Sequence, residues 1–140
     1  SDTFQNRIHL IFIHTSFLFI NLKKNNENLK LKDFQQKLFD LTFKKIEQNM
    51  REIGYGDVVV NKNMKFLVKN FYNILLKCET YRNADKASKN AFFLKYLNYE
   101  KKEMAVNNVH LIEYFNKYEL FCIDLNPDSV LKGYLNFNYK

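Results

Sequence analysis

Residues 50–72, with the sequence MREIGYGDVVVNKNMKFLVKNFY, decide the fold of this chain. Two of the three glycines in the sequence, Gly54 and Gly56, lie in this stretch. Glycine takes the left-handed conformation that follows many helices more readily than any other residue, and a second glycine lets the next helix fold back closely. We therefore expect a helix to end at Gly54, a structural corner at Gly54 and Gly56, and a new helix from about Asn61.

Apolar residues recur at helical spacing on both sides of this corner, and strand-like alternation is nearly absent. The expected helices cover about residues 3–22, 32–53 and 61–82, a short segment that ends near residue 97, and residues 104–124. A polar loop, residues 23–30, separates the first two. Asn126-Pro127-Asp128 ends the last one and can open a further turn. The predicted fold class is all-α, a single-domain bundle of about five to six helices over residues 1–140.

The first helix is apolar on most of its sides. Asp2 or Thr3 can cap it, and His9, His14 and Asn21 are among the polar residues that interrupt its apolar run. This run is shorter than the ~20 apolar residues that a membrane-spanning helix needs. The pattern therefore favours a buried central helix over a membrane span.

The second and third helices each show an apolar stripe and a polar face. The stripes consist of Phe34, Leu38, Leu41, Ile46, Met50 and Ile53 in the second helix, and of Met64, Leu67, Val68, Phe71, Leu75 and Cys78 in the third. Lys62, Lys65 and Lys69 recur on the other side of the third helix. Their spacing of three and four residues aligns three ammonium groups along one exposed face, which either is simply solvated or contacts an anionic partner.

Two charged residues at the corner, Arg51 and Asp57, are further candidates for partner binding. Glu47 and Arg51 stand four residues apart, in the order that favours an ion pair within a helix. The Asp57 carboxylate can accept backbone N–H bonds and cap the next helix, or it can pair with Arg51 or Lys62. A structural role is favoured for Asp57, and direct contact with a partner is the alternative.

Composition narrows the class of protein. The 14 Phe and 9 Tyr in 140 residues indicate a globular chain rather than a disordered one. The formal net charge of +7 is compatible with nucleic acid or an anionic membrane as a partner, but only three of the 22 basic residues are arginines. Because Lys, Asn, Phe, Tyr and Ile have AT-rich codons, drift in base composition explains part of this charge. Cys78 and Cys122 lie far apart in apolar contexts, so we expect buried thiols rather than a disulfide.

No enzyme or metal motif is present. Gly54-Tyr55-Gly56 lacks the third glycine and the preceding strand of a dinucleotide site. His9 and His14 are five residues apart, about 140° around a helix, and therefore cannot hold one metal together. His14 instead needs a hydrogen-bond partner, and His110 stands alone. We expect no catalytic residue, no metal site and no cofactor in this chain.

A set of residues around the corner resembles a known family. The set is Met50-Arg51-Glu52, Gly54, Gly56-Asp57, Val60, Lys62, Met64-Lys65 and Phe71-Tyr72, with Asp2-Thr3, Arg7 and Ile13-His14 upstream and Pro127, Leu131, Gly133 and Phe137 downstream. This pattern is similar to that of the ubiquinol–cytochrome c chaperones, assembly factors that handle newly made cytochrome b of the bc1 complex. The chain departs from the pattern at Asn73-Ile74, where the family commonly has Gly-Arg.

The resemblance implies a non-enzymatic assembly chaperone whose client is nascent or newly inserted cytochrome b. It also suggests contact of the lysine face with the ribosome near the exit tunnel or with an anionic membrane, and a small partner protein; we expect no specific binding to DNA. The implied location is the cytoplasmic side of a bacterial inner membrane or the matrix side of the mitochondrial one. The family usually has further sequence before the Asp-Thr motif, so we expect residues before Ser1 in the full product.

A chaperone for a membrane protein needs an apolar acceptor surface. The surplus of aromatic residues in the last third of the chain is where we expect it. The candidates are Phe92, Phe93, Tyr96, Tyr99, Tyr114, Tyr118, Tyr134, Phe137 and Tyr139. Two alternative functions remain open at this point: a general RNA- or ribosome-binding helical protein without a cytochrome b client, and a small-molecule enzyme, which would need a deep pocket with titratable groups.

Overall fold

The structure is a computed structural model that describes residues 4–23, 28–97 and 104–138, with side chains from residue 109 onward in the last range. Its helices are α1 (Phe4–Leu22), α2 (Leu29–Ile53), α3 (Asp57–Glu79), α4 (Lys86–Tyr96), α5 (Met104–Ile123) and α6 (Pro127–Leu131), with a short 3-10 helix, η2 (Tyr81–Asn83), between α3 and α4. The described residues contain no strand, and the predicted all-α class is confirmed.

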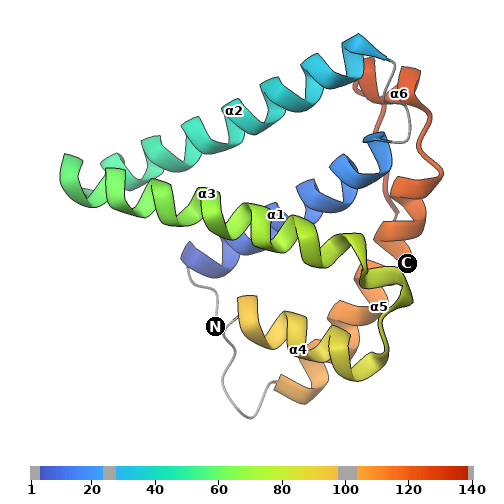
Figure 1. Cartoon of the computed structure of the whole chain (residues 1–140). Coiled ribbons are helices and arrows are strands. Elements are labelled where there is room, and N and C mark those ends of the chain that lie inside the picture. The colour runs from blue at the N-terminus through green and yellow to red at the C-terminus, as the bar shows by residue number, and fades with distance from the viewer. Residues whose placement is uncertain (1–3, 24–27, 98–103, 139–140) are drawn as a thin grey trace.

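Helix α1 is the centre of the fold (Figure 1). It contacts α2, α3 and α5, and it packs most extensively along α3. Ten of its 19 residues are buried, including Phe12, Ile13 and Phe17. The prediction of a buried central helix is confirmed, because a helix that is apolar on most sides finds neighbours on most sides. None of the helices in the described ranges is long and apolar enough to cross a membrane.

Helix α2 begins three residues earlier than the sequence predicted, which shortens the expected polar loop. The Asn28 side chain accepts hydrogen bonds from the backbone N–H groups of Lys30 and Leu31, so Asn28 caps a helix that starts at Leu29. The predicted stripe is also partly wrong. Leu41 and Ile53 are exposed, and the side chains that α2 buries are Leu31, Phe43, Ile46 and Met50.

The corner between α2 and α3 is tighter than predicted. Gly54 has a left-handed φ of 107°, and its N–H donates to the Arg51 carbonyl oxygen at 3.0 Å. Gly56 has an extended conformation, with φ −73° and ψ 164°, and α3 begins directly after it at Asp57 rather than near Asn61. Three consecutive valines disfavour a helix locally, but burial of Val60 against the core outweighs this weak preference. Helices α2 and α3 then diverge, and the corner projects beyond α1 (Figure 1).

The C-terminal half begins with a break at the end of α3. Helix α3 ends at Glu79 rather than near Arg82, and Tyr81 in η2 is turned into the core. Asp85 caps α4 by accepting from the Ser88 N–H at 2.7 Å. Asn126 caps α6 in the same way, directly before Pro127. Helices α4 and α6 thus begin where the sequence places capping residues.

Aromatic rings form two groups, which α1 joins. One lies between α1, α2 and α3, where Phe12 is 5.3 Å from both Phe43 and Phe71 between ring centroids. The other lies between α1, α4 and α5, where the Phe93 and Phe115 rings stack at 5.4 Å. Cys78 and Cys122 are free and buried, as predicted. Desolvation on burial raises the pKa of the Cys122 thiol to about 12, so it is not a reactive thiolate at neutral pH.

Candidate functional site

The outer face of α3 carries the three lysines of the predicted stripe. Lys62, Lys65 and Lys69 are all exposed, and none of them forms an ion pair with a described residue. The sequence of α3 contains no acidic residue between Asp57 and Glu79. The field of these ammonium groups is therefore not neutralised along the helix itself, and the face attracts anionic groups.

Exposed apolar side chains lie among these lysines. The sequence analysis did not predict these apolar residues to be exposed. Val58 is 82% exposed and Leu76 is 62% exposed, and Phe66 and Tyr72 are about half exposed. At 3.6 residues per turn, Val58, Lys62, Lys65, Lys69, Tyr72 and Leu76 fall within about a quarter of the helix circumference, and Phe66 borders them. The seven residues are called the α3 face below. The sequence could have indicated this face, because the series from Val58 to Leu76 continues without interruption at spacings of three and four residues.

Charged contacts tie the two ends of the corner together. Arg51 donates hydrogen bonds to Glu47, at 3.1 Å, and to Asp57. Hydrogen bonding to Asp57, and secondarily to Glu47, raises the pKa of Arg51. Of the alternatives for Asp57, the structure shows the ion pair with Arg51; its side chain makes no capping hydrogen bond, and Gly56 is the N-cap residue. Arg51 and Asp57 are both exposed, beside the exposed Tyr55.

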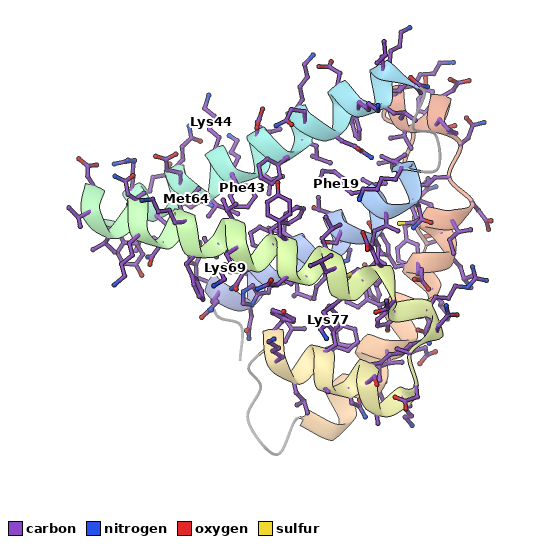
Figure 2. The ribbon with its side chains drawn as sticks, in the orientation of Figure 1. Phe19, Phe43, Lys44, Met64, Lys69 and Lys77 are labelled. Atoms are coloured by element: carbon purple, nitrogen blue, oxygen red, sulfur yellow. The ribbon has the colours of Figure 1, made fainter. Side chains whose placement is uncertain are left out.

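A groove opens where α2 and α3 diverge. It has a volume of about 210 Å³ and lies between α1, α2 and α3, near Phe19 and Phe43 in Figure 2. Its lining consists of Phe19, Lys32, Gln35, Gln36, Phe39, Phe71, Tyr72 and Leu75. Tyr72 belongs both to this groove and to the α3 face. A segment that contacts Tyr72 on the α3 face can therefore extend into the groove, where Lys32 lies among the lining residues.

Most of the described C-terminal aromatic residues are buried or half-buried, and Phe92 and Tyr96 among them line cavities. Phe93 is fully buried, and the half-buried Tyr114 and Tyr118 pack against Phe137, each with ring centroids 5.5 Å from its ring. Phe92 and Tyr96 are largely buried as well, and only Tyr134 is mostly exposed. Tyr99 and Tyr139 lie outside the described residues. Most of the aromatic surplus fills the core around α1, and the larger exposed apolar surface lies on α3.

The two histidines of α1 have different hydrogen-bond partners. His9 Nδ1 is 2.6 Å from the Tyr96 carbonyl oxygen, and its Nε2 is 3.2 Å from the Asn70 side-chain amide. His14 Nε2 lies 2.8 Å from the Tyr114 hydroxyl, which is the kind of partner predicted for it. Desolvation lowers the pKa of both imidazoles. Among the described side chains, no three His, Cys, Asp or Glu residues cluster as a metal site requires.

The site residues can now be set beside known proteins. Ile74, at the position where the sequence departs from the family pattern, is fully buried and offers nothing to a partner. The family model for the ubiquinol-cytochrome C chaperone matches residues 1–116, a range that includes the corner and all of α3 but ends before Pro127 and Gly133. No curated protein and no solved structure matches the chain. The chain belongs to the ubiquinol-cytochrome C chaperone family.

Proposed function

We propose that this protein is an assembly chaperone for the cytochrome bc1 complex that binds newly made cytochrome b through the α3 face. The family supports the role in bc1 assembly. The observation that carries the finer proposal is the interleaving of exposed apolar side chains and lysines on α3, from Val58 to Leu76. An exposed apolar patch with a charged border is typical of a surface that binds another protein.

The two kinds of side chain have different tasks in this proposal. Val58, Phe66, Tyr72 and Leu76 cover apolar client surface that is not yet packed in the complex, and the contact gains free energy from removing both surfaces from water. Lys62, Lys65 and Lys69 increase the rate of encounter with anionic groups, such as acidic client loops, ribosomal RNA near the exit tunnel or an anionic membrane. In this proposal the apolar contacts supply most of the affinity for the client, and the lysines direct the protein to anionic surfaces.

The proposed activity is recognition, without a catalytic step or a cofactor. The haem belongs to the client, and this protein delays misassembly until haem or partner subunits arrive. The location we propose is the cytoplasmic side of a bacterial inner membrane or the matrix side of the mitochondrial inner membrane. A small partner protein and peripheral membrane contact are part of the same proposal.

Site-specific photo-crosslinking in cells tests the proposal. A photoreactive phenylalanine analogue at position 66 should form a crosslink to cytochrome b. The same analogue at position 120 is the matched control, because Leu120 on α5 is exposed to a similar extent as Phe66. Equal labelling of cytochrome b from both positions, or none from position 66, would contradict binding through the α3 face.

The second candidate function is that of a general RNA- or ribosome-binding protein. The absence of acidic residues between Asp57 and Glu79 favours binding to RNA, as it favours binding to any polyanion. The two functions differ in salt dependence. Affinity for ribosomal RNA should fall steeply between low and moderate salt, whereas a predominantly apolar contact with cytochrome b should persist. RNA binding with this steep dependence, combined with no cytochrome b crosslink, would select the second function.

A further inference from the structure

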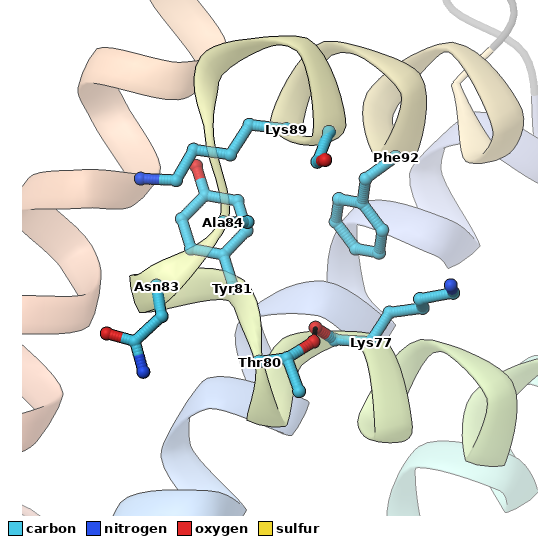
Figure 3. A pocket seen from close by; sticks show the side chains of 8 residues that line it. Lys77, Thr80, Tyr81, Asn83, Ala84, Lys89 and Phe92 are labelled. Atoms are coloured by element: carbon cyan, nitrogen blue, oxygen red, sulfur yellow. Dashed lines mark hydrogen bonds between the residues drawn. The ribbon is translucent and has the colours of Figure 1, made fainter.

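Two adjoining cavities lie between the end of α3, η2 and α4, away from the corner. Figure 3 shows the larger of the two. Their volumes are about 360 Å³ and about 250 Å³. Lys77, Ser88 and Phe92 line both cavities. Tyr81 and Lys89 belong to the larger cavity, and Tyr96 and Lys95 belong to the smaller one.

The same arrangement of a lysine over a tyrosine ring occurs in each cavity. The Lys89 ammonium lies 4.5 Å from the centroid of the Tyr81 ring, and the Lys95 ammonium lies 5.4 Å from that of the Tyr96 ring. Lys77 and Lys89 stand on opposite sides of the larger cavity (Figure 3). No described carboxylate lines either cavity, and no ion pair between described residues involves these lysines. Three lysines thus line the two cavities, and no described carboxylate lines either one, although the Glu119 carboxylate is near enough to contribute to the raised pKa of Tyr81.

Both tyrosine hydroxyls lack a hydrogen-bond partner within the described part of the chain. Tyr81 is 3% exposed and Tyr96 is 5% exposed, so solvent access to these hydroxyls is minimal. An unpaired buried hydroxyl is unfavourable, and each such group calls for an explanation. Burial raises the pKa of Tyr81, and its hydroxyl therefore remains a proton donor at neutral pH. A bound acceptor at this place would restore the missing hydrogen bond.

We propose that the two cavities bind an amphiphilic phosphate ester, with Lys89 contacting the phosphate beside Tyr81, Lys77 and Lys95 adding positive charge at the borders of the cavities, and Phe92 contacting the apolar part. Lys89 donates one hydrogen bond to Asn116 Oδ1, at 3.0 Å, and keeps two further donors for the ligand. Movement of its side chain from the Tyr81 ring also opens a path to the Tyr81 hydroxyl. The volume of the larger cavity is at the lower end of the roughly 300–1,000 Å³ range of small-molecule pockets, which suits a headgroup better than a whole lipid.

The phosphate can come from a phospholipid headgroup or from a soluble phosphate ester, and titration with two probes separates these sources. Glycerol phosphate carries the anionic group alone, and dihexanoyl phosphatidylglycerol adds short acyl chains. NMR of the backbone amides of the wild-type protein should show saturable shifts centred on Ser88 and Lys89. Clearly tighter binding of the phospholipid is expected and assigns a lipid headgroup. Equal affinity for both probes would assign a soluble ester and contradict the contact proposed for Phe92.

Charge-matched variants test whether the cavities are the site. The combination Lys77→Gln, Lys89→Gln and Lys95→Gln should weaken binding by roughly tenfold or more, because the charge-assisted contact of Lys89 with the phosphate and the positive charge at the borders of the cavities are lost. The control combination Lys30→Gln, Lys44→Gln and Lys45→Gln removes the same charge from exposed positions on α2 and should change affinity little. Equal weakening by both combinations, or no saturable binding of either probe to the wild type, would overturn the proposal.

Tyr81→Phe is the sharpest single variant. It removes only the unpaired hydroxyl, so the protein should fold normally while phosphate affinity falls by about fivefold to tenfold. Unchanged affinity in a folded Tyr81→Phe protein would show that the hydroxyl does not meet the ligand and would contradict the site as described. Crosslinking from position 66 to cytochrome b should be the same in wild type and in all these variants, so this proposal and the proposed client can fail separately.

Discussion

Helices α1 and α2 differ sharply in how much of each is covered by the rest of the protein. Ten of the 19 residues of α1 are buried, whereas only four of the 25 residues of α2 are buried. The packing around α1 depends on rings from α3, α4 and α5, distant in sequence. The α2–α3 hairpin combines such contacts, of Phe43 and Phe71 with Phe12, with two local signals, the Asn28 cap and the Gly54 turn. The comparison teaches that the hairpin can keep its shape while its outer surface stays uncovered.

This difference suits a division of labour. The α1 region supplies most of the stability through buried apolar area, and the hairpin presents exposed apolar and cationic side chains to a partner. If the division is correct, substitutions around α1 should change the free energy of unfolding, and substitutions on the α3 face should change binding. The predictions below test this contrast, beginning with the largest expected effect on stability.

Phe115→Ala should give the largest loss. Phe115 is fully buried, and its ring contacts those of His14, Phe17 and Phe93. Removal of a buried phenyl ring typically lowers the free energy of unfolding by about 3–5 kcal/mol, through lost transfer energy and the cavity left behind. Urea denaturation measures the change. The matched control is Phe66→Ala on the α3 face, which should cost less than about 1 kcal/mol; equal losses would end the proposed division.

Acidification should destabilise the α1 region next. Burial lowers the pKa of His9 and His14 below the ordinary value of 6.5, so the unfolded chain binds protons that the folded chain does not. Stability is therefore complete above about pH 6.5 and declines as the pH falls below that value, by up to about 1.4 kcal/mol per pH unit for each histidine. Thermal melts between pH 7 and pH 5 measure this slope.

The variant His14→Gln should flatten this decline, because its side chain does not titrate and can still hydrogen-bond to Tyr114. His110→Gln, at an exposed position of α5, is the control and should keep the wild-type slope. A slope that is identical in wild type and in His14→Gln would show that His14 takes up its proton without unfolding cost.

The corner should respond to backbone geometry alone. Gly54 has a φ of 107°, and an added Cβ atom meets no neighbouring atom within 4 Å, so conformational strain is the main penalty expected at this position. Gly54→Val should therefore lower the free energy of unfolding by about 1 kcal/mol or more, because a β-branched residue is strained at positive φ. Gly56→Ser is the control. Its φ of −73° suits serine, which is a good N-cap, and this variant should be neutral or slightly stabilising.

The α3 face should show the smallest effect on stability and a clear effect on binding. Lys62→Glu, Lys65→Glu and Lys69→Glu together should leave the melting temperature nearly unchanged, because exposed charges contribute little. The same variant should weaken co-sedimentation with ribosomes or anionic vesicles at low salt. Normal folding combined with wild-type co-sedimentation would leave the lysines as a solvated face and assign binding to the apolar side chains alone.

The sequence by itself determined the features that have local causes. The Gly54 turn, the helical class, the exposed lysines of α3 and the start of α6 at Asn126-Pro127 depend on φ preferences, periodicity and capping, each of which acts within a few residues. The most specific part of the family resemblance was also local, the block of residues around the corner. These features could be predicted because no distant residue changes them.

The tertiary structure alone decided which apolar residues are covered. Leu41 and Leu76 are chemically identical to the leucines of the core, yet both are exposed, because no described element packs over their side of the helix. Of the aromatic residues of α4 and α5 that were predicted to line a groove or interface, most fill the space around α1, and Phe92 and Tyr96 line cavities. The cavities at Phe92 join residues of α3, η2 and α4, and the tyrosine hydroxyls there lost water only on folding. Burial is a property of the assembled helices, and periodicity specifies only the faces available for it.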